Sequence, residues 1–351
     1  MPSENAKDGG AERRRGREIL ARCKSAKVEL VRFLYCGNDS VIRGKACHTR
    51  FLNSYLRSGI GLTVAMQSFN MLDQLAPEGS FGPVGEIRLV PDLETFALLP
   101  YTAKSARLLC DMHTLEGKPW DACPRRFLKR TIEQARHAGL ALQATFENEF
   151  TLARRDGEQF VPIDRSPCFS TIGMDGATPV MIDVIEALIA QGVYPEQYYA
   201  ELGPGQQELP VRFADALRAA DNQLTVRDTA RGVAMKHGLL ASFAPKPFPD
   251  QAGKAAISTG ASGGSRTART TSTIPAAATG SRRRATRSSA ASSRICPRSS
   301  RSRRRASTPT AACSRASGRA RTPPGGPTTA RPPSACRPRA AASRWSRPIS
   351  S

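Results

Sequence analysis

The chain changes character at residue 254, and this change limits how much of it can form a packed core. Residues 254–351 contain 20 Arg and 1 Lys but neither Asp nor Glu, and they also lack Leu, Val, Phe and Tyr. A segment with so little apolar surface cannot offset the entropy that it loses on ordering. The composition therefore predicts a disordered, low-complexity basic tail, rich in Arg, Ser and Pro, over residues 254–351.

The formal net charge of +22 is misleading, because the tail contributes +21 of it. Residues 1–253 are close to neutral, so a basic nucleic-acid-binding surface is not expected on them. A dense positive run binds polyanions without specificity, and nucleic acid is therefore expected as a partner only through the tail.

Cysteine usage and the amino terminus bear on the compartment. The 9 cysteines are irregularly spaced and form no CxxC pair, which argues against a disulfide framework and a zinc site. The first 20 residues lack the apolar core of a signal peptide, and no stretch has the length of a membrane span. These features predict a cytoplasmic protein with no membrane partner.

Periodicity divides the chain ahead of the tail into three parts. Residues 1–25 are expected to be a flexible arm. Residues 26–105 contain β-branched and aromatic runs, with two strands joined by a turn at "GNDS" and one short helix, which predicts a small α+β domain. Residues 106–253 alternate strands with longer helices, one of which is expected to begin at Thr178 and Pro179 and to end at Gly192.

Two pairs of glutamates are candidate metal ligands. Glu147 and Glu149 are two residues apart on a predicted strand, so they project from one face. Glu201 and Glu208 flank "GPG", a turn signal that can bring them together. Solvated strand and hairpin surfaces are the alternative for both pairs, but the apolar residues around the first pair favour a buried strand. Four such carboxylates suit Mg²⁺ or Mn²⁺ at a two-metal phosphoryl-transfer site.

Several linked motifs resemble one family. "FENEF", "ELGPGQQELPVRF" and "RDTARGVAMKHGLLASFAPKPFPDQAG" look like glutamine synthetase, and "GKACHTRFLNSYLRSGIG" and "PDLETFALLP" resemble its small domain. The resemblance covers residues 26–253. It implies an α+β fold, with a β-grasp-like N-terminal domain over 26–105 and a partial, truncated catalytic α+β domain over 106–253.

The resemblance also implies an activity and its partners. Family members are ATP-dependent ligases of glutamine biosynthesis and nitrogen metabolism, in which the side-chain carboxylate of glutamate takes the terminal phosphate of ATP and an amine then captures the γ-glutamyl phosphate. The implied cofactors are ATP and Mg²⁺ or Mn²⁺, and intact relatives form homo-oligomers. The ammonium-binding loop of the family corresponds to "GLTVAMQSFNMLDQ" here, which leaves ammonia and a larger amine as alternative acceptors.

The resemblance assigns site residues by motif position. Glu149, Glu201 and Glu208 correspond to the ligands of one metal ion, and Glu147 corresponds to the first ligand of a second. Phe213 corresponds to a residue that lines the nucleotide site, and a core aromatic is its alternative. The catalytic residues stay unknown, because in the family most of them lie beyond the position of Gly253.

A shifted reading frame explains the break after Gly253. The family continues with a motif such as N-G-x-H-x-H-x-S, whereas this chain continues "KAAISTGASG". Adding one base inside the codon of Lys254 allows "NGCHIHWSLW" to be translated, and shifting a GC-rich frame yields Arg, Ala, Ser and Pro. We therefore expect a ligase that is inactive in this form. The alternative is a non-catalytic relative whose Arg-rich tail evolved to bind nucleic acid or another polyanion.

Overall fold

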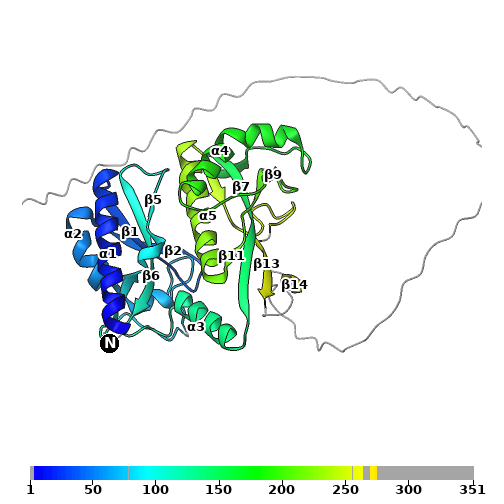
Figure 1. Ribbon diagram of the computed structural model, residues 1–351. Coiled ribbons are helices and arrows are strands. Elements are labelled where there is room, and N and C mark those ends of the chain that lie inside the picture. Colours follow the sequence, from blue (N-terminus) through cyan, green and yellow to red (C-terminus); the bar gives the residue numbers. More distant parts are fainter. Residues whose placement is uncertain (1–3, 78, 255, 264–268, 275–351) are drawn as a thin grey trace, which may run out of the picture. The chain divides into compact units, whose positions relative to one another are not determined.

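A computed structural model describes residues 4–77, 79–254, 256–263 and 269–274 (Figure 1). Within these ranges the chain forms a mixed N-terminal sheet and a second, antiparallel sheet, with helices packed against them. The predicted α+β class is confirmed. None of the helices in these ranges combines the length with the apolar composition that crossing a bilayer would require.

The N-terminal sheet is built on a hairpin and a parallel pair. Strands β1 and β2 pair antiparallel from Leu30 opposite His48 to Cys36 opposite Ile42, as predicted, and β1 also pairs parallel with β6. The strand order β2-β1-β6-β4-β3, with β5 beside β6, fits the predicted β-grasp-like arrangement. The elements are α1 (Glu4–Ser25), β1 (Leu30–Cys36), β2 (Ile42–His48), α2 (Thr49–Ser58), β3 (Ile60–Thr63), η1 (Val64–Gln67), β4 (Glu86–Pro91), η2 (Leu93–Thr95), β5 (Ala97–Leu98) and β6 (Ser105–His113).

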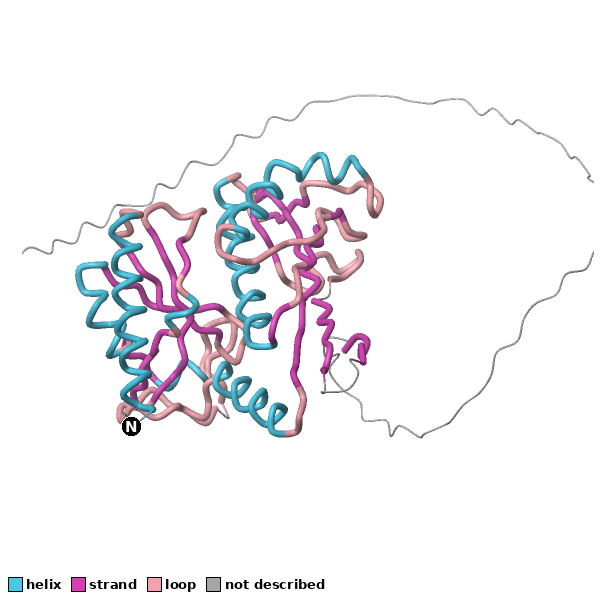
Figure 2. Tube along the Cα trace, viewed as in Figure 1, coloured by secondary structure: helices cyan, strands magenta, loops and turns pink. Residues whose placement is uncertain are grey.

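Helix α1 corrects the prediction of a flexible arm over residues 1–25. The helix runs alongside α2 (Figures 1 and 2), and Ile19 and Cys23 are only 1% and 2% exposed in the core of the N-terminal sheet. Because these two residues are four apart, they lie on one face of a helix. The segment is rich in charged residues, and the few apolar residues that bury one face of the helix were therefore not recognised in the sequence.

The second sheet depends on one long strand. Strand β7 pairs antiparallel with β8, β10, β11, β12 and β13, and of the other strands in this sheet only β9 and β14 do not pair with it directly. The core of this part lies between β7 and helices α4 and α5. The elements are α3 (Pro124–His137), β7 (Ala141–Asp156), β8 (Gln159–Pro162), α4 (Thr171–Ile189), β9 (Tyr199–Ala200), β10 (Gln206–Pro210), β11 (Ala214–Asp215), α5 (Ala216–Lys236) and β12 (Leu240–Ser242).

Helix α4 begins earlier than the sequence predicts. Ser170 caps it by accepting a hydrogen bond from the amide of Ile172, and Pro179 lies inside the helix rather than in its first turn. Thr178, the expected cap, instead donates its hydroxyl to the carbonyl of Met174. A proline inside a helix removes one backbone donor, but the surrounding packing of α4 keeps the helix continuous.

Polar contacts tie the N-terminal sheet to α3 and α5. The Arg125 guanidinium donates to Asp92 at 2.8 Å, Asp111 at 2.9 Å and Asp221 at 2.8 Å. The Tyr101 hydroxyl donates to Asp228 at 2.8 Å. The contacts of Asp92, Asp111 and Tyr101 join the first sheet region to α3 or α5, and the Asp221 contact joins α3 to α5.

Two strands lie within the predicted tail. The backbone of β13 (Ala256–Gly263) pairs with β7 over Ala141–Asn148, and β14 (Arg269–Ile274) pairs with β13. The prediction of a disordered tail from residue 254 therefore does not hold for these two segments, because backbone groups can complete an open sheet edge whatever the side chains. Residues 275–351 of the predicted tail lie outside the described residues.

Gly232 is a strict packing constraint, and we predict that Gly232→Ala destabilises the fold. A Cβ at this position of α5 would lie 2.2 Å from the Tyr101 ring, which is too close for any real contact. The free energy of unfolding should fall by about 1–3 kcal/mol, measured by urea denaturation.

Gly176 of α4 provides the matched control, because a Cβ there would meet nothing within 4 Å. Gly176→Ala should stabilise the protein by about 0.5–1 kcal/mol through helix propensity. Equal effects of the two substitutions would contradict the close approach of Tyr101 to α5.

Candidate functional site

One face of β7 carries the predicted glutamates and the other carries the core. Phe150 and Leu152 are fully buried against α4 and α5, so Glu147 and Glu149 project from the opposite face. On the neighbouring strand β10, Glu208 lies directly opposite Glu149 in the ladder. Side chains of directly opposed residues are neighbours on the same face, and the structure thus brings these two carboxylates together.

The turn predicted at "GPG" is present, and it leads the chain back to the side of the sheet that carries Glu147 and Glu149. Gly205 has φ of +62°, and a Cβ there would lie 2.4 Å from the carbonyl oxygen of Leu152. The amide of Gln206 donates to the Gly203 carbonyl at 3.0 Å, and the amide of Glu201 donates to the Gln206 carbonyl at 2.9 Å. This tight turn needs glycine and places Glu201 on the segment that leads into β10.

The electrostatics of Glu208 show how close the four glutamates are. Burial raises the pKa of Glu208 to about 7, a hydrogen bond from Tyr199 opposes the rise, and the charges of Glu149, Glu201 and Glu147 add to it. Glu208 is only 6% exposed. Glu208 is thus a buried carboxylate on which three further negative charges act, and such a site favours a bound cation.

Two neighbours that the sequence analysis did not single out orient this cluster. The Gln206 amide donates to a carboxylate oxygen of Glu149 at 2.5 Å. Tyr199 faces Glu208 across the β9–β10 ladder and donates its hydroxyl to it. The two-residue period of β10 places Gln206 on the same face as Glu208, so the pattern could have indicated Gln206, whereas Tyr199 depends on a cross-strand register.

Cys168 and Lys254 complete the surroundings. The Cys168 thiol lies 3.7 Å from a carboxylate oxygen of Glu201. The Lys254 ammonium donates to the Thr151 hydroxyl at 2.8 Å and to the Ser242 carbonyl at 2.7 Å. Burial lowers the pKa of Lys254 to about 8, although the Glu149 charge opposes this shift. The first residue of the predicted tail thus places a positive charge beside the glutamate face.

The glutamates fit a divalent cation by their chemistry. Carboxylate oxygens are the ligands that Mg²⁺ and Mn²⁺ prefer. Burial raises the pKa of Glu208, and the charges of Glu149, Glu201 and Glu147 add to the rise. Across the described part of the chain, however, no three His, Cys, Asp or Glu side chains are gathered closely enough to hold a metal ion as they stand. Side-chain rearrangement would have to accompany binding.

Phe213 is not a core residue. It lies between β10 and β11 and is 58% exposed, so the alternative of a buried aromatic does not hold. An exposed aromatic ring close to the carboxylate strands is compatible with a base-stacking surface, and its role toward a nucleotide stays a prediction.

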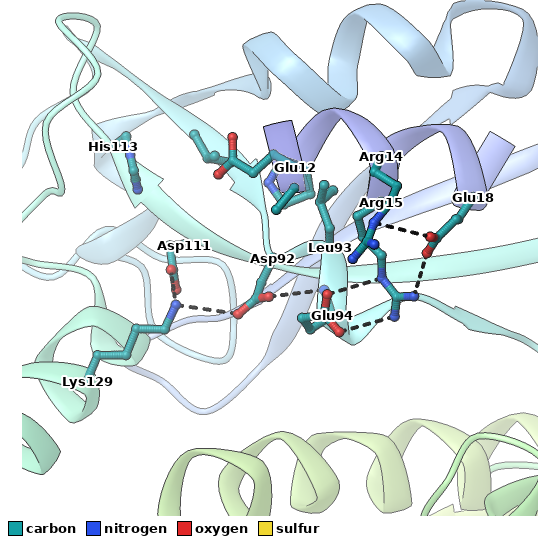
Figure 3. A pocket seen from close by; sticks show the side chains of 13 residues that line it. Glu12, Arg14, Arg15, Glu18, Asp92, Leu93, Glu94, Asp111, His113 and Lys129 are labelled. Atoms are coloured by element: carbon teal, nitrogen blue, oxygen red, sulfur yellow. Dashed lines mark hydrogen bonds and ion pairs between the residues drawn. The ribbon is translucent and has the colours of Figure 1, made fainter. Parts of the chain in front are cut away.

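A cavity of about 580 Å³ is lined by residues of α1, β4, β6 and α3, and none of the four candidate metal ligands lines it (Figure 3). Its charged side chains are largely paired with one another. Glu18 lies between Arg14 and Arg15, and Lys129 contacts Asp111 and Asp92. Because these charges already compensate each other, the cavity offers little free charge for a ligand.

Comparison with known families decides the assignment. Residues 14–120 match the family model described as the glutamine synthetase N-terminal domain, and residues 121–256 match that of the glutamine synthetase catalytic domain. This chain belongs to the glutamine synthetase family. The resemblance carried by its motifs is confirmed, and the family is one of ligases.

Individual relatives support the same assignment. A glutamate–isopropylamine ligase of Pseudomonas sp is 30% identical over 240 residues, which are 64% of this chain and 52% of that protein. Glutamine synthetase of Mycobacterium tuberculosis is 33% identical over 247 residues, 68% of this chain and 53% of that protein. A crystal structure of a glutamine synthase homolog superposes with a TM-score of 0.62 at 30% identity, covering 68% of this chain and 56% of that one. The chain spans about half the length of the curated relatives that it matches.

We predict that Glu208 makes the fold less stable as pH rises from about 4.5 to about 7 in the absence of divalent ions. The folded state binds the Glu208 proton more tightly than the unfolded chain does, because its pKa is raised to about 7. Deprotonation therefore costs folding free energy, on the order of 3 kcal/mol across that window. Urea unfolding at a series of pH values measures the effect.

Glu208→Gln should remove this decline, since glutamine mimics the protonated carboxyl at every pH. Glu158→Gln, on the exposed turn between β7 and β8, is the control and should leave the decline in place. The same pH dependence in both variants would contradict the raised pKa of Glu208.

Proposed function

We propose that residues 14–256 come from an ATP-dependent ligase that joins the side-chain carboxylate of glutamate to ammonia or a larger amine. The observation that carries this proposal is the pairing of Glu208 with Glu149 on adjacent strands, with Glu147 and Glu201 close enough to raise the pKa of Glu208. Family membership supports it. The named activities of the two relatives, one using isopropylamine and one making glutamine, keep both amine classes open.

In this proposal the glutamates divide between two divalent ions. Glu149, Glu201 and Glu208 would hold one Mg²⁺ or Mn²⁺, and Glu147 would contribute to a second. Such ions neutralise phosphate oxygens when ATP is bound. Gln206 and Tyr199 would keep the Glu149 and Glu208 carboxylates oriented through their hydrogen bonds. Phe213 would supply an exposed ring for the nucleotide.

We also propose that the chain as it stands has lost this activity through a shift in reading frame. The match to the catalytic domain ends at residue 256, although the chain continues to residue 351. The tail that follows contains no Asp or Glu and no His, so it cannot supply further carboxylate or imidazole ligands. The alternative of a tail adapted to polyanions concerns residues that lie largely outside the described ranges.

Metal binding tests the site itself. Titration of the full chain with Mn²⁺, followed by the loss of the free-ion electron paramagnetic resonance signal, should show saturable binding. Glu201→Gln and Glu208→Gln should each weaken it at least tenfold, because each removes a charged ligand. Glu158→Gln should bind Mn²⁺ like the parent chain. Unchanged affinity in the first two variants would overturn the metal assignment.

Restoring the frame tests the activity. One base added within the codon of Lys254 should convert a chain that releases no phosphate from ATP into one that does so when glutamate and an amine are present. Phosphate release with ammonia and with isopropylamine then identifies the acceptor class. A frame-restored product without activity toward either amine would count against the ligase proposal, and an active unmodified chain would count against the frame shift.

A further inference from the structure

Two arginines of α5, Arg227 and Arg231, lie against the same aromatic ring. Their guanidinium carbons are 6.0 Å and 5.2 Å from the centre of the Phe243 ring. Phe243 in turn packs against Phe150, with the ring centres 5.4 Å apart. Because Phe150 is on the core face of β7, opposite the glutamates, this arginine pair is a separate feature of the chain and does not depend on the proposed ligase.

The positive charges of this arginine pair are poorly compensated. Residues four apart on a helix are neighbours, and like charges at this spacing repel each other. Burial lowers the pKa of Arg231, the charge of Arg227 lowers it further, and the charge of Asp228 opposes the shift. Within the described ranges no carboxylate lies within ion-pair distance of either guanidinium, and Asp228 accepts a hydrogen bond from Tyr101 at 2.8 Å. The pair therefore favours a bound anion.

The N–H groups of the pair are open to such a ligand. Arg227 donates to the Ser40 carbonyl at 2.8 Å. Arg231 makes no hydrogen bond to the described residues, and none of its nitrogen atoms is among the buried polar atoms that lack a partner. Its N–H groups are therefore accessible to solvent, although the side chain is half-buried. Because a guanidinium has five N–H groups, most of those of the pair remain for a ligand.

We propose that Arg227 and Arg231 bind a phosphoryl group, as inorganic phosphate or as a phosphate monoester. Each guanidinium can donate two parallel N–H bonds to an oxyanion. A phosphoryl group has a charge of about −1.5 to −2 at pH 7 and three acceptor oxygens, which match two cations. A carboxylate has one charge and two oxygens, and it satisfies only one guanidinium in this way. The Phe243 ring holds both side chains, which lowers the entropy that they lose on binding.

Calorimetric titration of the full chain with inorganic phosphate, in the absence of divalent ions, tests the site. Saturable binding is expected, and Arg231→Gln should weaken it at least tenfold, because charge-assisted hydrogen bonds are lost. Arg231→Lys, which keeps the charge but not the planar group, should fall between the two. Arg154→Gln, at an exposed arginine of β7, is the matched control and should bind phosphate like the parent chain. The arginines of residues 254–351 are common to all these chains, so the differences report on residue 231.

Arginine labelling gives a readout at single residues. Phosphate should slow the reaction of Arg231 with phenylglyoxal, followed by mass spectrometry, and leave the reaction of Arg154 unchanged. Glycerol phosphate should protect Arg231 as well, and the ligand that protects at the lower concentration shows whether the site prefers the free ion or a monoester. Acetate at the same ionic strength should give no protection.

Three results would overturn the proposal. These are an identical Kd for phosphate in Arg231→Gln and the parent chain, equal protection of Arg154 and Arg231 by phosphate, and protection by acetate equal to that by phosphate. The first two would place phosphate binding on other arginines, and the third would mean that the pair does not distinguish a phosphoryl group from a carboxylate.

Mn²⁺ binding separates this proposal from that of the ligase site. Arg231→Gln should bind Mn²⁺ like the parent chain, because the arginine pair and the glutamates lie on opposite faces of β7. A loss of phosphate binding with Mn²⁺ binding retained therefore concerns the arginine pair alone. If Arg231→Gln also lost Mn²⁺ binding, the substitution would have disturbed the fold, and Arg227→Gln would take its place in both experiments.

Discussion

Arg125 is the residue on which the arrangement of the two sheets depends. Its guanidinium reaches three carboxylates, one after β4, one on β6 and one on α5, and Lys129 adds a second cation to the same group. Removing one partner of such a buried network leaves an uncompensated charge, which is far costlier than the network's net contribution to stability. Charge pairing, together with apolar contacts, therefore fixes the position of the N-terminal sheet relative to α3 and α5.

Much of this fold could be predicted from the sequence, because its signals are local. The β1–β2 hairpin has β-branched strands around a turn, α5 has a long helical run, and β7 alternates between core and glutamate faces. The glutamates of the candidate site were found for the same reason. Glu147 and Glu149 follow the two-residue period of a strand, and Glu201 and Glu208 flank a turn that only glycine permits.

The features that the sequence did not indicate depend on distant parts of the chain. Ile19 and Cys23 anchor helix α1 by packing into the core of the N-terminal sheet, and this core exists only when that sheet has formed. Tyr199 contacts Glu208 because the two residues face each other in the pairing of β9 with β10. Lys254 donates a hydrogen bond to Thr151, which is more than a hundred residues earlier in the sequence. No local period encodes such contacts, and Phe213 could not be distinguished from a core aromatic for the same reason.

Strand β13 shows that completing a sheet and completing an active site are separate requirements. The edge of β7 is satisfied by peptide groups, which every translation product carries, and the main chain of residues 256–263 supplies them. Ligands, in contrast, must come from particular side chains. A segment without a single carboxylate or imidazole side chain can therefore close the open edge of this sheet, although it offers the neighbouring site no such ligand.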